Sequence, residues 1–162
     1  LKITNLIGKI SSLEPLKGRG KVYKLKIKNK QIFLIDESYN SNPDSLKVAL
    51  ANLKNYKKKE NKIICIIGDM LELGKESSRM HSSIVKYLKK AKPDIIYTVG
   101  NFSKLITKKL PNKFTSIHFY DYKKVFNTLI NVISNDDVIM VKGSNSSNVN
   151  KISKKLLEDG AN

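Results

Sequence analysis

Apolar runs rich in β-branched residues recur along the chain, and each ends at a glycine or a polar residue. The runs cover residues 63–67, 95–99 and 138–141, with a weaker one at 117–120. Unbroken apolar runs of this length are typical of strands that are covered on both faces, as in a parallel sheet. Nearer the N-terminus, residues 22–27 alternate apolar residues with lysine, and an apolar run at 32–35 follows the polar pair Asn29-Lys30. This pattern predicts a β-hairpin with one exposed face and its turn at Asn29-Lys30.

Between the runs the apolar residues take the spacing of an α-helix. Such stripes occur at Leu46, Ala49, Leu50 and Leu53, at Ile84, Val85 and Leu88, at Phe102, Leu105 and Ile106, at 125–133, and at Val149, Ile152 and Leu156. The first helix has favourable entry residues, because Asn42 is a good N-cap and Pro43 fits the first helical position. Strands that alternate with helices predict an α/β fold, with a mainly parallel sheet flanked by helices and preceded by the hairpin.

Length and composition exclude several classes of protein. The chain has 162 residues, of which 40% are hydrophobic, so one domain with a sizeable core is expected. No apolar run reaches the roughly 18 residues that a membrane span needs. The single cysteine, Cys65, allows no internal disulfide and lies in an apolar run, where we expect it to be inert. No cluster of Cys and His could hold a zinc ion, so the sequence argues against a disulfide scaffold, a zinc module and a membrane protein.

The net charge of +17 admits two interpretations. A polyanion such as nucleic acid is one partner that a basic chain suits. However, only Arg19 and Arg79 are arginine, and lysine is spread along the whole chain. Proteins that read bases or clamp phosphates rely on the arginine fork. We therefore expect lysine-rich solvated surfaces and no specific nucleic-acid site.

Polar clusters follow the predicted strands at the point where each strand ends. They are Asp36 to Asn40, Gly68-Asp69-Met70, Gly100-Asn101 and Lys142 to Asn145. In an open parallel sheet these positions gather at one edge, where ligands bind. Such residues also serve simply to turn and cap the chain. The sequence contains no phosphate loop and no Gly-x-Ser-x-Gly nucleophile elbow.

Four ordered motifs resemble the Mur ligase family, in the branch that adds D-alanyl-D-alanine. Residues 36–45, DESYNSNPDS, are similar to the family signature Asp-Asp-x-Tyr-Asn-Ala-Asn-Pro-x-Ser. The other three are Gly18-Arg19, the segment 68–74 with Ser77 and His81 downstream, and Lys142-Gly143-Ser144. The chain departs from the family pattern at Glu37, Ser41 and Asn145, which stand where relatives have Asp, Ala and often Arg.

The resemblance implies a fragment of a three-domain enzyme. Residues 14–162 are expected to be its C-terminal domain, with a Rossmann-like sheet, and residues 1–13 the end of a central domain or a linker. The family reaction uses ATP, with Mg²⁺ held mainly by the central domain, to activate the carboxylate of UDP-N-acetylmuramoyl-tripeptide as an acyl phosphate. The amine of D-Ala-D-Ala then attacks it. We expect a cytoplasmic, monomeric enzyme of peptidoglycan precursor synthesis, and a fragment that closes over ATP and is inactive alone.

The resemblance also assigns roles to individual residues. Arg19 is expected to contact the terminal phosphate of ATP and to be catalytic. The expected nucleotide contacts are Asp36 and Glu37, at the ribose, the metal shell or Arg19 itself, and Tyr39, Asn40 and Asn42, at the adenine and ribose. Lys142, Ser144 and Asn145 are expected at the dipeptide, although a plain surface lysine is an equal interpretation of Lys142. His81 is expected to support the loop at 68–74.

Two other functions stay open. One is the C-terminal domain of a related ligase such as folylpolyglutamate synthase, against which the string Tyr39-Asn40-Ser41-Asn42-Pro43 argues. The other is a stand-alone basic domain that binds nucleotides or nucleic acid.

Overall fold

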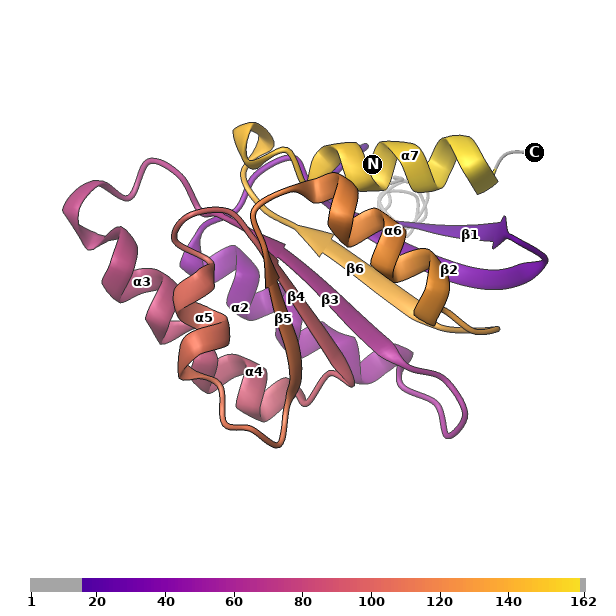
Figure 1. Ribbon diagram of the computed structural model, residues 1–162, viewed down its shortest axis with the longest axis horizontal. Helices are drawn as coiled ribbons and strands as arrows, with labels where there is room; N and C mark the ends of the chain where they lie inside the picture. The colour runs from indigo at the N-terminus through magenta and orange to yellow at the C-terminus, as the bar shows by residue number, and fades with distance from the viewer. Residues whose placement is uncertain (1–15, 161–162) are drawn as a thin grey trace, which may run out of the picture.

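Six strands form one mixed sheet in the computed structural model, which describes residues 16–160 (Figure 1). The strands are β1 (Lys21–Ile27), β2 (Lys30–Glu37), β3 (Ile63–Gly68), β4 (Ile95–Val99), β5 (Thr115–Phe119) and β6 (Val138–Lys142). Their order across the sheet is β1-β2-β6-β3-β4-β5. Only β1 and β2 run antiparallel, and every other neighbouring pair is parallel. The predicted α/β fold, the mainly parallel sheet and the N-terminal hairpin are confirmed.

The hairpin turn differs from its prediction by one residue. The turn residues are Lys28 and Asn29, and Lys30 is already in β2, opposite Ile27. Both turn residues have positive φ, 46° and 63°. A two-residue turn of this kind matches the right-handed twist of the strands, and asparagine tolerates the left-handed conformation.

Helices cover both faces of the sheet. They are α2 (Pro43–Asn52), α3 (Ser77–Ser83), α4 (Val85–Ala91), α5 (Lys104–Lys109), α6 (Tyr122–Val132) and α7 (Asn150–Gly160), with short 3₁₀ turns η1 (Leu53–Tyr56), η2 (Gly74–Glu76) and η3 (Asn145–Ser147). Figure 1 shows α6 and α7 on one face, and α2 with α3 to α5 on the other.

The central strand β3 shows why the apolar runs are unbroken. Ile64 and Ile66 pack in the core beneath α6 and α7, whereas Ile63, Cys65 and Ile67 pack in the core beneath α2, α4 and α5. All of β3 is buried. Burial raises the pKa of the Cys65 thiol, which agrees with an inert cysteine.

The predicted helical stripes become core faces, except that Phe102 and the half-buried Leu105 lie outside both core clusters. Phe102 precedes α5 and is 37% exposed, so its assignment to that stripe is wrong. Its backbone is instead held in a loop by Asp69, as described below. Within residues 16–160 no helix combines the length and the apolar character needed to cross a bilayer. The expectation for residues 1–13 lies outside the described residues.

Candidate functional site

Ser144 joins three of the strand-end loops. Its backbone N–H donates to the carbonyl of Asp69 at 3.0 Å, and its hydroxyl oxygen accepts from the N–H of Leu71 at 2.9 Å. The same hydroxyl donates to the carbonyl of Ser41 at 3.4 Å. The loops after β2, β3 and β6 therefore meet at one edge of the sheet, as the parallel topology predicts.

Two glycines make this meeting possible. A Cβ on Gly143 would lie 3.0 Å from the Cα of Gly68 and 2.6 Å from a methyl group of Val149. A Cβ on Gly68 would lie 2.7 Å from a second methyl group of Val149. The ends of β3 and β6 are thus too close to each other and to the start of α7 for any side chain.

Lys142 is buried in this edge. Its side chain is 2% exposed, and its Nζ donates to Oε2 of Glu37 at 3.2 Å and to the carbonyl of Asn40 at 3.1 Å. The surface-lysine interpretation is therefore wrong. Glu37 is more open, with a side chain 27% exposed. The ion pair ties the end of β6 to the loop after β2.

Asp36 is also buried, at 2% exposure, and holds the start of that loop. Its Oδ1 accepts from the hydroxyl of Ser38 at 2.6 Å and from the N–H of Ser38 at 3.3 Å. Its backbone carbonyl accepts from the N–H of Gly20 at 2.8 Å. The segment that precedes β1 is therefore fixed against the loop after β2.

Arg19 lies exposed at the rim of this arrangement. Its guanidinium stacks on the ring of Tyr39, with 4.4 Å between Cζ and the ring centroid. Within the described part of the chain it forms no ion pair with Asp36 or Glu37. Gly18, the residue before it, has φ +76°, and the Gly18 carbonyl accepts from the N–H of Tyr39 at 3.0 Å. A permanently charged planar donor is thus held beside the strand-end loops.

The two asparagines of the signature have local roles. Asn42 caps α2, because its Oδ1 accepts from the N–H of Ser45 at 2.8 Å, while the Ser45 hydroxyl accepts from the N–H of Asn42 at 3.1 Å. This reciprocal capping box confirms the predicted N-cap. Asn40 is exposed, and its Oδ1 accepts from the N–H of Ser41 at 2.7 Å.

Asp69 organises the loop between β4 and α5. Its carboxylate accepts from three successive backbone N–H groups, those of Asn101 at 2.8 Å, Phe102 at 3.1 Å and Ser103 at 2.8 Å. A Cβ on Gly100 would lie 2.5 Å from this carboxylate, so the loop requires glycine there. The sequence analysis placed Asp69 at this edge but did not predict its role in the loop. The available signal was an aspartate after β3 together with a glycine after β4, the neighbouring strand.

His81 supports the loop after β3, which confirms its predicted role. Its Nε2 accepts from the N–H of Met70 at 2.9 Å, and its Nδ1 donates to the carbonyl of Ser77 at 2.7 Å. The imidazole ring stacks on the Phe102 ring, with 5.6 Å between the two ring centroids. Burial lowers the pKa of His81, although the Ser77 carbonyl and Asp69 act in the opposite direction. The neutral ring is therefore the favoured form.

A cleft of about 380 Å³ opens between α7 and the segments that carry Arg19 and Tyr39. Its lining is Lys17, Gly18, Asp36, Ser38, Tyr39, Asn145, Asn150, Lys151, Ser153, Lys154 and Leu157. Asn145 reaches α7 here, because its Oδ1 accepts from Nδ2 of Asn150 at 2.6 Å. Asn150 and Ser153 were missed by the sequence analysis, since Val149, Ile152 and Leu156 mark α7 only as a core helix.

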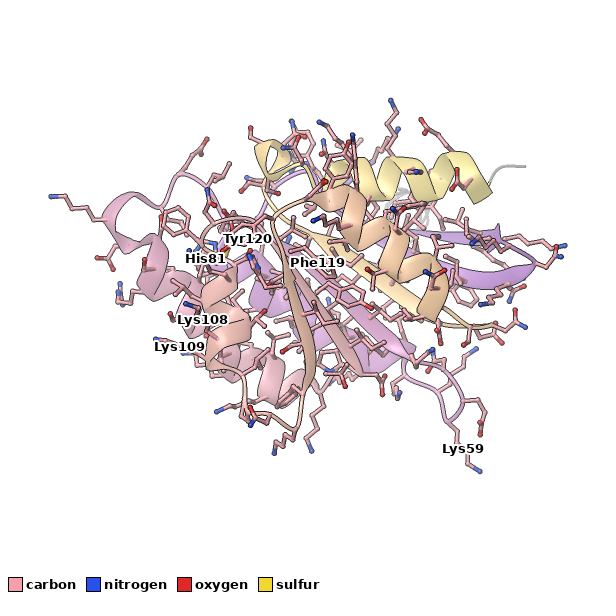
Figure 2. All side chains as sticks on the ribbon, in the orientation of Figure 1. Lys59, His81, Lys108, Lys109, Phe119 and Tyr120 are labelled. Carbon is pink, nitrogen blue, oxygen red and sulfur yellow. The ribbon has the colours of Figure 1, made fainter. Side chains whose placement is uncertain are left out.

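Positive charge is not gathered at this cleft alone. Figure 2 shows Lys59 projecting from the loop before β3, far from Lys108 and Lys109 on α5. These three lysines are exposed. Lysine is thus spread over separate parts of the surface.

The fold and the strand-end contacts define an α/β domain whose candidate ligand edge is built from the loops after β2, β3, β4 and β6. The family model described as Mur ligase, glutamate ligase domain, matches residues 18–145, which contain the loops after β2, β3 and β4 and the first residues of the loop after β6. The chain belongs to the Mur ligase family.

One curated relative agrees with this assignment, and two solved structures share the fold. A UDP-N-acetylmuramoyl-tripeptide–D-alanyl-D-alanine ligase of Rickettsia prowazekii is 33% identical over 160 residues, which cover 94% of this chain and 34% of the relative. The crystal structure of a MurF ligase from Thermotoga maritima in complex with ADP superposes with a TM-score of 0.77 at 19% identity, over 98% of this chain and 36% of that chain. A folylpolyglutamate synthase/dihydrofolate synthase from Yersinia pestis gives a TM-score of 0.59 at 16% identity, over 86% and 31%. The chain spans about a third of the length of the ligase from Rickettsia prowazekii.

Proposed function

We propose that the chain is the C-terminal domain of a ligase that adds D-Ala-D-Ala to UDP-N-acetylmuramoyl-tripeptide at the expense of ATP. The names of the sequence relatives support this substrate assignment, as does the signature at residues 36–45. The remaining two thirds of the enzyme would supply the phosphate loop, most of the Mg²⁺ site and the UDP-sugar site. The setting would be peptidoglycan precursor synthesis in the cytoplasm.

The observation that carries the proposal is the placement of Arg19. Its side chain is exposed at the ligand edge and stacked on Tyr39, beside a cleft that Asp36 lines. A guanidinium on a planar support offers two parallel N–H donors to phosphate oxygens. A carboxylate accepts hydrogen bonds, so Asp36 suits ribose hydroxyls. These residues fit a nucleotide that lies between this domain and a neighbouring one.

The chemistry would divide between the domains. ATP, when bound, supplies the phosphoryl group that activates the peptide carboxylate. Arg19 would stabilise negative charge on the transferring phosphate, the role in which preorganised donors contribute most. The buried pair Lys142 and Glu37 would hold the loop after β2 in place, and Ser144 would hold the loops after β3 and β6.

A ligation assay tests the proposal. The full-length protein that contains this chain is incubated with ATP, Mg²⁺, UDP-N-acetylmuramoyl-tripeptide and D-Ala-D-Ala, and the products are followed by mass spectrometry. We expect the pentapeptide product with stoichiometric ADP and phosphate, and none when D-Ala-D-Ala is left out. Residues 1–162 alone should release no phosphate. Ligation of glutamate to a folate in place of this reaction would overturn the proposal in favour of the folylpolyglutamate synthase alternative.

A further inference from the structure

We propose that the first half of α7 forms a second wall of the nucleotide cleft, and that Asn150 and Ser153 on it read the amino edge of the nucleobase. This inference rests on the proposed function, because it takes ATP as the ligand at this edge. The family model ends at residue 145, so α7 lies beyond the segment that it matches.

Two shielded polar atoms of α7 have no hydrogen-bond partner within residues 16–160. Ser153 is 2% exposed, and its hydroxyl forms no hydrogen bond within the described residues. The Oδ1 of Asn150 is likewise shielded from water and unpaired within this part of the chain. Both residues line the cleft. Buried polar atoms are nearly always paired in proteins, so two orphans in one wall indicate groups that a ligand satisfies.

Asn145 fixes which end of the Asn150 amide remains free. Its Oδ1 accepts from Nδ2 of Asn150 at 2.6 Å, so the amide nitrogen is occupied and the carbonyl oxygen is not. Asn145 stands where the similar family motif often has arginine, and an arginine has no acceptor to offer Nδ2. The asparagine at position 145 therefore occupies the Asn150 amide nitrogen and leaves the Asn150 Oδ1 free to accept.

The chemistry of the cleft identifies the class of ligand. The free Oδ1 can only accept, so it requires a donor such as an exocyclic amine, and a ring carbonyl at the same place would be repelled. The Tyr39 ring and the Asp36 carboxylate also line the cleft and suit a base and a ribose, while Lys17, Lys151 and Lys154 suit phosphates. An aminopurine nucleotide meets all of these requirements. The arrangement favours ATP over inosine triphosphate, which has a carbonyl in place of the amine.

Equilibrium binding to the full-length protein tests the inference without catalysis. ATP and inosine triphosphate displace a fluorescent ATP analogue, and each dissociation constant is measured for the parent and its variants. We expect the parent to prefer ATP by about tenfold, the scale of one hydrogen bond with an unpaired group at stake. Asn150→Ala should bring the two constants to within about twofold. The matched control is Asn55→Ala, an exposed asparagine on η1, which should keep the preference.

Ser153→Ala provides an independent measurement. Because the variant removes an unsatisfied buried hydroxyl, its melting temperature without nucleotide should equal or exceed that of the parent. Its affinity for ATP should nevertheless fall about threefold to tenfold. Unchanged ATP affinity in Ser153→Ala together with an unchanged preference in Asn150→Ala would overturn the inference and leave the proposed function standing. A parent protein that binds no ATP at all would overturn both.

Discussion

Breaking the buried ion pair from its two ends should have unequal effects on stability. Glu37→Gln leaves the ammonium of Lys142, whose side chain is 2% exposed, with only the carbonyl of Asn40 and a neutral amide. An uncompensated buried charge costs about 3–5 kcal/mol, and the remaining two acceptors reduce this to about 2–3 kcal/mol. Lys142→Met leaves a carboxylate whose side chain is 27% exposed and can be hydrated, so about 1 kcal/mol is expected. In a domain of this size the melting temperature should fall by about 4–12 °C in the first variant and 2–4 °C in the second.

Urea and thermal unfolding of the two variants, followed by circular dichroism, measure this difference. The double variant Glu37→Gln/Lys142→Met should be more stable than Glu37→Gln alone, since it removes the stranded ammonium. If Lys142→Met were the more damaging change, or if both changes were within about 0.5 kcal/mol of the parent, the pair would not hold the edge together. Lys142 would then be available for the dipeptide, as the resemblance implies.

Three further predictions concern single residues. In the full-length enzyme, Arg19→Ala should lower turnover by about a hundredfold or more, and Arg19→Lys should recover only part of that loss. The melting temperature should change little, because the side chain is exposed. Near-normal turnover in a variant with a lowered melting temperature would contradict this prediction. Since burial lowers the pKa of His81, the unfolded chain binds a proton at this residue more readily than the folded chain does. The contribution of His81 to stability is therefore full above about pH 6.5 and declines as the pH falls below that value. Between pH 8 and pH 5, the melting temperature of His81→Gln should fall less than that of the parent. Gly100 has φ +121°, and a Cβ there would lie 2.5 Å from the Asp69 carboxylate, so Gly100→Ala should lower the free energy of unfolding by more than about 3 kcal/mol. Gly74 has φ +52° and open space around it, so Gly74→Ala should lower it by about 1 kcal/mol. Equal urea midpoints for the two variants would refute the assignment of that clash.

The sheet was predictable because its signal is local. Each apolar run is long enough to place one strand, and the helical stripes between them require parallel connections. The errors arose where a backbone conformation decides the outcome. Positive φ at Lys28 and Asn29 moved the hairpin turn by one residue, and the carboxylate of Asp69 held Phe102 outside α5. Neither effect is visible in the pattern of apolar positions.

The candidate site was predictable as a set of loops but not as a set of contacts. The motifs named Lys142 and Ser144 as groups for a ligand, yet the structure uses both within the chain. A sequence gives the type of each side chain, whereas the partner of each depends on which loops the topology brings together. Asn150 and Ser153 show the converse case, because their polar atoms stand out only once their burial and lack of partners are known.

The ligand edge therefore contains two kinds of polar residue. Asp69, Ser144 and the pair Glu37–Lys142 are committed to neighbouring loops, and they set the geometry of the edge. The Asn150 Oδ1 and the Ser153 hydroxyl have no hydrogen-bond partner among the described residues, and Arg19 is held there only by stacking on Tyr39. Substitutions in the first group should act mainly through stability, and those in the second mainly through nucleotide affinity or turnover. Unfolding and binding measured side by side on the same variants therefore separate the residues that build this edge from those that bind at it.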